Sequence, residues 1–208
     1  MATPARNPDL HGNVPDKSDV ALLLIDVLND LEFDSGARLL KPALRMARQL
    51  SKLARRARKL GIPVIYVNDN FGKWRSDFRQ QLAHCLRDDV RGKPVVEMLQ
   101  PEPHDYFVLK PKNSGFYNTT LELLLEYLQV KRVIVAGIAT NNCVLFTAND
   151  AYMRDLEVLV PRDCVAAADP AEHRHALTQM RKVLKARTGS QSALDLAALA
   201  GRRKRKRR

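Results

Sequence analysis

Residues 20–25 read VALLLI, an uninterrupted apolar run that ends at Asp26. A strand with one solvent-facing side alternates apolar and polar residues, whereas a fully apolar run is typical of a strand covered on both faces, as in parallel sheets. Similar short runs, bounded by Gly, Pro or charged residues, recur at 62–67 (IPVIYV), 106–109 (YFVL), 132–136 (RVIVA) and 156–160 (LEVLV). The sequence therefore predicts a parallel sheet with at least these strands.

Helical patterns separate most of these runs. A capping box of Thr119 with Glu122 predicts a helix start, and leucines then repeat on one face. Residues 40–60 alternate apolar and cationic side chains at helical spacing, which predicts an amphipathic helix with a basic, solvated face. A polar residue at 140–141 can cap another helix that runs to about residue 154. Strands that alternate with helices predict an α/β fold: a doubly wound, mostly parallel sheet in a three-layer α/β/α arrangement.

The length of 208 residues suits one domain. We predict a flexible N-terminal arm at 1–18, which is polar and holds three prolines, a single domain at 19–200, and a disordered basic tail at 201–208. The stretch 68–103 is less regular than the rest. It is the predicted place for a lid or for a contact with a partner.

Charge, apolar runs and cysteine spacing indicate in which compartment of the cell the protein is located. The formal net charge is +12, and seven positive charges form the run 202–208 (RRKRKRR), so that +12 less these seven leaves +5 for the rest. No apolar run approaches the roughly 20 residues of a membrane-spanning helix. The first nineteen residues lack a secretory signal, and the three cysteines form no CxxC pair. We therefore expect a cytoplasmic protein with reduced thiols and no contact with a membrane.

Three chemically complementary residues stand where strands end or a helix begins. Asp26 follows the first run, Lys110 follows the run 106–109, and Cys143 lies in the first turn of the helix predicted after 132–136. Ligands of open α/β sheets bind beyond the carboxyl ends of the strands, so these residues are expected to meet at one edge. A helix N-terminus and a nearby ammonium are expected to lower the pKa of the thiol, and a carboxylate can accept its proton. Acyl transfer through a thioester is the reaction class that these groups favour.

Each residue also has an ordinary structural interpretation. Cys143 alone fits a small core residue, Asp26 fits a turn cap, and Lys110 fits one of many solvated lysines. Their joint placement at three separate strand ends favours the catalytic interpretation.

The chain resembles the isochorismatase-like cysteine hydrolases, a family that includes nicotinamidases, N-carbamoyl amide hydrolases and ureidoacrylate hydrolases. The resemblance covers about residues 19–165 through ALLLIDVLND, VLKPKNSGFYNTTL and VIVAGIATNNCVLFTANDAYMRDLEVLVPRDCV, of which the last block is the most specific. It implies a catalytic triad of Asp26, Lys110 and Cys143 and a sheet of about six strands. It also implies a cis peptide between Ile138 and Ala139, an oxyanion hole from the backbone N–H groups of Ala139 and Cys143, and a homo-oligomer.

Departures from relatives narrow the predicted substrate. Nicotinamidases of this family carry a metal site with an Asp and two His residues, one shortly after the second strand, and VNDNFGKWRSDF holds no histidine there. The five histidines show no spacing of metal ligands, so we expect no metal and no cofactor. Isochorismatases that cleave a vinyl ether lack the nucleophilic cysteine, whereas Cys143 is present. We expect hydrolysis of the C–N bond of a small amide, N-carbamoyl or ureido compound.

Aromatic residues near the triad are candidates for the wall of a substrate pocket, although such residues are more often part of a core. The candidates are Phe33, Trp74, Phe116 and Phe146. Arg75 is a candidate partner for a substrate carboxylate, with an exposed salt bridge as the ordinary alternative. Asp69 and Asn70 are candidates to hold a water or ion, with a loop turn as their ordinary role.

A rival hypothesis makes the domain a scaffold without catalysis, whose basic tail binds nucleic acid or an acidic partner. Seven consecutive cations can contact phosphates without sequence specificity. The tail contains no aromatic residue to stack on bases, so we expect any binding of nucleic acid to be weak.

Overall fold

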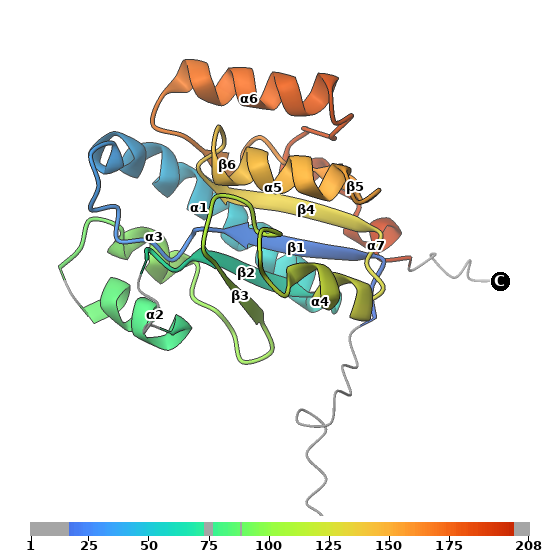
Figure 1. Ribbon diagram of the computed structural model, residues 1–208, viewed down its shortest axis with the longest axis horizontal. Helices are drawn as coiled ribbons and strands as arrows, with labels where there is room; N and C mark the ends of the chain where they lie inside the picture. Colours follow the sequence, from blue (N-terminus) through green and yellow to red (C-terminus); the bar gives the residue numbers. More distant parts are fainter. Residues whose placement is uncertain (1–16, 73–76, 88, 202–208) are drawn as a thin grey trace, which may run out of the picture.

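The computed structural model describes residues 17–72, 77–87 and 89–201, and its centre is a parallel sheet (Figure 1). Five strands follow the order β3-β2-β1-β4-β5, and β6 pairs with the end of β4, beyond the residues that pair with β5. The strands are β1 (Val20–Ile25), β2 (Val64–Asp69), β3 (Tyr106–Lys110), β4 (Arg132–Ile138), β5 (Glu157–Leu159) and β6 (Val165–Ala166). The predicted doubly wound α/β sheet of about six strands is confirmed.

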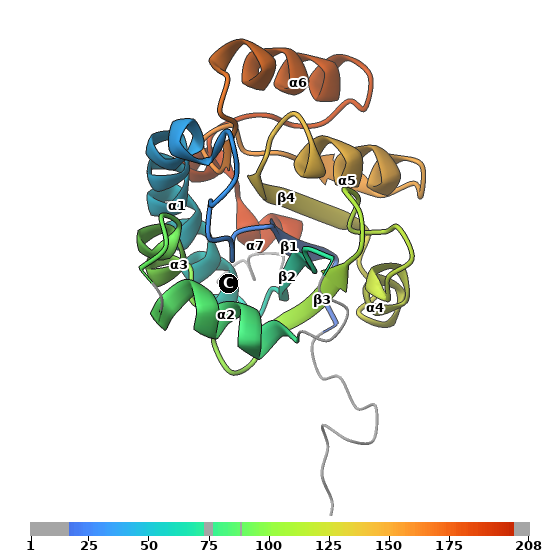
Figure 2. The same cartoon turned by 60° about the vertical axis from the view of Figure 1, so that its left-hand side comes forward.

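Helices cover both faces of the sheet, and Figures 1 and 2 show the two outer layers. One face carries α1 (Gly36–Lys59), α2 (Phe78–Arg87), α3 (Lys93–Met98), the short 3-10 helix η1 (Gln191–Ala193) and α7 (Leu196–Leu199). The other face carries α4 (Leu121–Tyr127), α5 (Cys143–Tyr152) and α6 (Pro170–Lys182). The molecule is therefore a three-layer α/β/α domain.

The alternation of side chains along β1 explains why its sequence is apolar throughout. Leu22 and Leu24 pack into the core under α1, whereas Leu23 and Ile25 pack into the core under α4 and α5. All six residues of the strand are 0% exposed. A polar residue anywhere in this strand would enter one of the two cores, which is why the run is continuous.

Several predicted boundaries differ from the structure. β2 begins at Val64 rather than at 62, because Pro63 has no N–H for a ladder bond and contributes only its carbonyl, to Leu22. The predicted capping box is wrong: α4 begins at Leu121, and the Thr119 hydroxyl accepts the N–H of Leu121 itself. Within the irregular stretch 68–103, the described residues form α2 and α3.

The predicted arm and tail lie mostly outside the described residues. Ser18, which we assigned to the arm, is buried, and its N–H donates to the Leu128 carbonyl at 3.0 Å. The packed structure thus begins at least one residue before the predicted boundary at 19. No helix in the described ranges is long and apolar enough to cross a membrane.

Candidate active site

Two neighbouring strands bring distant segments together at the carboxyl edge of the sheet. Asp26 follows β1 with a φ of 50°, a left-handed conformation that residues other than glycine seldom adopt. Gly137, in β4, has a φ of 119°, and a Cβ there would lie 2.1 Å from the Ile25 carbonyl oxygen. Only glycine permits this close approach, and the approach places the segment after β4 beside Asp26.

Lys110, the last residue of β3, is the centre of the site. Its side chain is 0% exposed, and its Nζ lies 2.9 Å from Oδ2 of Asp26. The same ammonium donates to Sγ of Cys143 at 3.5 Å and to the Lys112 carbonyl at 3.1 Å. A buried ammonium is costly unless it is paired and hydrogen-bonded, and these contacts satisfy it. The structure therefore brings the three predicted residues into mutual contact.

Asp69 is a member of this cluster that we did not predict. Its Oδ2 lies 3.3 Å from Nζ of Lys110, and its N–H donates to Oδ1 of Asp26 at 2.7 Å. The signal in the sequence was its position at the carboxyl end of a strand. The sequence did not indicate that β2 lies between β1 and β3. This position places Asp69, at the end of β2, beside both Asp26 and Lys110.

The turn before α5 places backbone donors beside the thiol. Cys143 is half-buried and is the first residue of α5, so its N–H is one of the groups that have no partner within the helix. The N–H groups of Asn142 and Val144 both donate to the Ala139 carbonyl, at 2.9 and 3.2 Å. The peptide bond between Ile138 and Ala139 is cis. The Thr140 N–H, bonded to the Ala166 carbonyl at 2.9 Å, ties this turn to β6.

The electrostatics of the cluster hold the thiol in its protonated form. Burial, followed by the Asp26 carboxylate, raises the pKa of Cys143 to about 12. Our prediction of a lowered thiol pKa is therefore wrong, because these two effects outweigh Lys110. Burial also raises the pKa of Asp26 against the opposing effect of Lys110. For Lys110, burial favours the neutral amine, but Asp26, Cys143 and Asp69 outweigh it and raise the pKa.

A cavity of about 650 Å³ opens onto this cluster. Its lining includes Asp26, Cys143, Ile138 and Ala139, so that the thiol and the turn before α5 face one space. The remainder of the wall is mixed, with the side chains of Asn29, Phe33, Ser35, Arg38, Leu39, Asp69, Phe71, Asn113, Asn141, Asn142, Ala168, Asp169 and Glu172. The volume is within the range of pockets that hold small molecules.

The four aromatic residues predicted for the pocket have different positions. Phe33 lines the cavity. Phe116 is buried in the core beneath α4 and α5, with the Arg154 guanidinium 4.7 Å from its ring centre, so its assignment to the pocket is wrong. Phe146 is 49% exposed on α5 and does not line the cavity, because it lies almost one helical turn beyond Cys143. Trp74, like Arg75, lies outside the described residues.

No group of three His, Cys, Asp or Glu side chains in the described ranges is arranged to hold a metal ion. The two polar residues that we named as candidates to hold a water or an ion make contacts within the chain. The Asp69 carboxylate pairs with Lys110 and accepts the Phe71 N–H, and Asn70 accepts the Gly72 N–H in the loop after β2.

The arrangement combines the groups that nucleophilic attack on a carbonyl requires. A thiol lies beside a carboxylate that can accept its proton, and the thiol belongs to the first residue of a helix, where backbone N–H groups have no partner within the helix. A buried ammonium fixes the positions of both side chains. Asp26 and Cys143 line the cavity, whereas Lys110 lies buried behind them.

Comparisons with known proteins identify the family to which this chain is similar. The family model described as "Isochorismatase domain" matches residues 20–192. The chain is 42% identical over 168 residues to the uncharacterized isochorismatase family protein YaaI of Bacillus subtilis, across 81% of this chain and 92% of that protein. It is 28% identical over 175 residues to a probable inactive nicotinamidase of Arabidopsis thaliana, across 79% of this chain and 89% of that protein.

Among solved structures, the chain is similar to the N-carbamoylsarcosine amidase of Thermoplasma acidophilum. The TM-score is 0.66 at 25% sequence identity, and the match covers 85% of this chain and 99% of that one. The likeness extends across almost the whole of that enzyme, so the sheet and both helical layers are shared.

Proposed function

Because this chain belongs to the isochorismatase family of hydrolases, we propose that it is a cysteine hydrolase that cleaves the C–N bond of a small amide, N-carbamoyl or ureido compound. The observation that carries this proposal is the position of the Lys110 ammonium, 2.9 Å from the Asp26 carboxylate and 3.5 Å from the Cys143 sulfur. The similarity to a carbamoylsarcosine amidase supports the class of bond.

In the first half of the reaction, Asp26 accepts the thiol proton as the Cys143 sulfur attacks the substrate carbonyl carbon. A carboxylate with an ordinary pKa is a weak base toward a thiol, and burial makes Asp26 a stronger one by raising its pKa. Lys110 stabilises the thiolate as it forms. The high pKa of the resting thiol means that attack and proton transfer occur together, since a free thiolate is scarce at neutral pH.

The tetrahedral intermediate places a negative charge on the former carbonyl oxygen. In this proposal the N–H groups of Ala139 and Cys143 donate to that oxygen. A single donor of this kind typically contributes about 2.7–4 kcal/mol to the chemical step. The C–N bond then breaks as protonated Asp26 gives its proton to the leaving nitrogen, which departs as ammonia or an amine.

The second half hydrolyses the thioester. Asp26, again a carboxylate, accepts a proton from water as the water oxygen attacks the thioester carbonyl. The C–S bond breaks, the sulfur regains the proton from Asp26, and the carboxylic or carbamic acid leaves. One water is consumed in each cycle, and no redox change occurs.

The cavity wall restricts the substrate to a small polar molecule. Phe33 and Phe71 line it together with four asparagines, Asn29, Asn113, Asn141 and Asn142. The amide groups can hydrogen-bond a carbamoyl or ureido function from both its donor and its acceptor sides. The Asn113 amide already donates to Oδ1 of Asn142 at 2.7 Å, which restricts the orientation of this pair.

The proposal is tested by replacing Cys143 with Ala and with Ser, using a panel of primary amides, N-carbamoyl compounds and ureido acids. Ammonia release should fall by at least about 10⁴-fold in both variants, because removal of a nucleophile removes the covalent route. Cys164→Ala is the matched control, because this cysteine is 0% exposed in the core and does not line the cavity. Its turnover should stay within about threefold of the original, and circular dichroism should show that all variants fold.

Two results would count against the proposal. Ammonia release that persists in Cys143→Ala would exclude the thioester route. Failure of the unmodified protein to turn over any compound in the panel, while Cys143 still reacts with iodoacetamide, would favour the scaffold interpretation.

A further inference from the structure

A second cavity, of about 450 Å³, lies between α1 and the segment that joins β6 to α6. It is separate from the active-site cavity, with which it shares no lining residue. The two cavities nevertheless lie on either side of one segment. Ala167 and Pro170 line the second cavity, whereas Ala168 and Asp169 line the first.

The charges around the second cavity are predominantly positive. Arg45, Arg48 and Arg162 line it, together with one carboxylate, that of Asp163. Within the described ranges, no carboxylate forms an ion pair with any of these three arginines. Asp163 uses Oδ1 to accept the N–H of Gln191 at 2.8 Å. The lining therefore carries more cationic charge than the surrounding residues neutralise.

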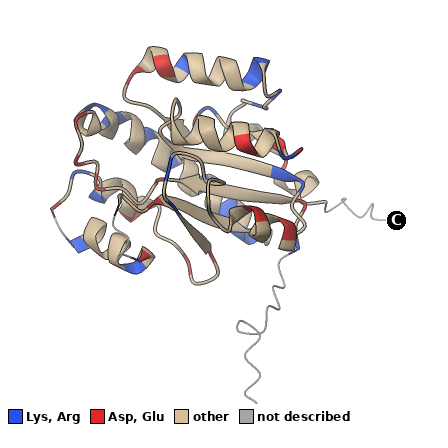
Figure 3. Cartoon of the chain, viewed as in Figure 1, with Lys and Arg blue, Asp and Glu red and all other residues tan. Residues whose placement is uncertain are grey.

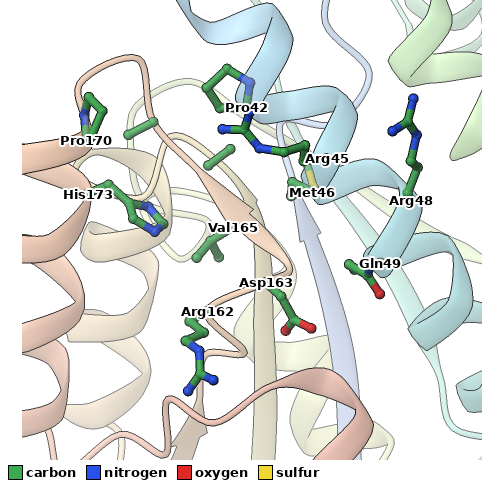
Figure 4. A pocket seen from close by; sticks show the side chains of 12 residues that line it. Pro42, Arg45, Met46, Arg48, Gln49, Arg162, Asp163, Val165, Pro170 and His173 are labelled. Atoms are coloured by element: carbon green, nitrogen blue, oxygen red, sulfur yellow. The ribbon is translucent and has the colours of Figure 1, made fainter.

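The side chains around the opening are arranged to meet a ligand from two sides (Figure 4). Arg45 extends from α1 across the opening, and His173 extends from α6 on the opposite side. Val165 lies between them at the base, with Met46 on the α1 side. Nδ1 of His173 is engaged with the Thr140 hydroxyl at 2.9 Å, so Nε2 is the ring nitrogen that remains for a ligand. Arg48 extends away from the centre and is not part of this arrangement.

We propose that this cavity binds a small organic anion, either a carboxylate or a phosphate monoester, whose apolar body rests on Met46 and Val165. A guanidinium offers paired donors that match the oxygen atoms of both kinds of anion. The apolar base favours an organic ligand over an inorganic ion. By contrast, the lining of the active-site cavity includes the carboxylates of Asp69, Asp169 and Glu172, which disfavour an anion there.

Helix α1 itself supplies a matched set of variants for the test. Arg38, Arg45 and Arg55 are all exposed and form no ion pair with a described carboxylate. Arg38 lines the active-site cavity, Arg45 lines the second cavity, and Arg55 lines neither. Replacement of each by Gln removes the same charge from the same helix. Only the position relative to the two cavities differs.

The experiment measures binding of phenyl phosphate, benzoate and inorganic phosphate to the full chain by isothermal titration calorimetry. Phenyl phosphate and benzoate should bind saturably, and inorganic phosphate should bind more weakly than phenyl phosphate. Arg45→Gln should lower the affinity for phenyl phosphate at least about tenfold, as expected for loss of a charge-assisted hydrogen bond. Arg55→Gln and Arg38→Gln should change its affinity less than about twofold, the effect of one distant surface charge.

Three outcomes would overturn the proposal. Equal weakening by all three variants would mean that a basic chain attracts anions without a defined site. Weakening by Arg38→Gln alone would place the ligand in the active-site cavity. Absence of saturable binding by the unmodified protein would mean that the cavity does not recognise this class of ligand. None of these outcomes depends on whether Cys143 is a nucleophile, because binding is measured without turnover.

Discussion

The buried charges around Lys110 depend on partners within the protein, whereas the exposed charges along α1 are solvated by water. Lys110 is 0% exposed and is held by two carboxylates, a thiol and a carbonyl. The outer face of α1 carries seven exposed cations at alternating spacings of three and four residues, which we call the α1 cation row (Figure 3). Its members are Arg38, Lys41, Arg45, Arg48, Lys52, Arg55 and Lys59.

No member of the α1 cation row forms an ion pair with a described carboxylate, and α1 contains no acidic residue. Water solvates these charges, so each contributes little to stability. The Lys110 side chain is 0% exposed, so water cannot solvate its ammonium in place of the protein groups around it. The stability of the fold therefore depends on those groups. The comparison teaches that one buried cation, Lys110, is more informative about function than the net charge of +12.

The largest effect that separates the two regions is expected from Lys110→Met. The variant leaves the carboxylates of Asp26 and Asp69 without their common cation, and breaking a buried pair in this way costs about 3–5 kcal/mol in the free energy of unfolding. Urea denaturation measures this cost. The matched control is Lys131→Met, whose ammonium is 71% exposed and lies 3.1 Å from Asp19. The control should lose less than about 1 kcal/mol in the free energy of unfolding. Equal losses in the two variants would contradict the claim that the buried ion pairs contribute more to stability than the exposed pair.

A smaller effect is expected from Asp26→Asn on the reactivity of Cys143. The Asp26 carboxylate is the second cause, after burial, of the thiol pKa of about 12. Its removal leaves Lys110 in place, so the pKa should fall and the thiolate fraction at pH 8 should rise about tenfold for each unit of that fall. Alkylation by iodoacetamide, followed by mass spectrometry, should therefore be faster although turnover is lost.

The Cys143→Ala variant, treated in the same way, gives the background rate from Cys85 and Cys164, which are buried. The Asp26 carboxylate has two opposed effects on the thiol: it can accept the thiol proton, and it repels the thiolate. Slower alkylation in Asp26→Asn would mean that the first effect outweighs the second.

The pH dependence of turnover offers a related check. Because Asp26 must be ionised to accept a proton and its pKa is raised, the acidic limb of kcat/KM should lie above the ordinary Asp value of 3.8.

The smallest effect, and one of opposite sign, is expected in the α1 cation row. Lys52→Glu replaces a repulsion with Arg48 and Arg56, each four residues away, by two attractions. Such pairs contribute about 0.2–0.5 kcal/mol each, so the variant should be slightly more stable at low salt, and the gain should shrink at high salt. Thermal unfolding at two ionic strengths measures it. A clear destabilisation would contradict the assignment of Lys52 to a row of solvated charges.

Much of the fold could be predicted because its signals are local. The apolar run at 20–25 coincides with β1, and the predicted meeting of Asp26, Lys110 and Cys143 follows from three strand ends at one edge of a parallel sheet. β6 was missed because two residues, Val165–Ala166, make no pattern. Phe116 was misplaced because an aromatic residue near a catalytic segment has the same local sequence whether its ring faces the cavity or the core.

The sequence by itself determined the layered α/β class, because a strand that is covered on both faces must be apolar throughout. It also indicated that Asp26, Lys110 and Cys143 meet at one edge of the sheet, because each follows a strand or begins the helix after one. The tertiary structure alone decided that Asp69 joins them, that the thiol is harder rather than easier to ionise, and that arginines of α1 border two different cavities. These properties depend on which strands are neighbours and on how completely water is excluded, and both are set by contacts between residues far apart in the chain.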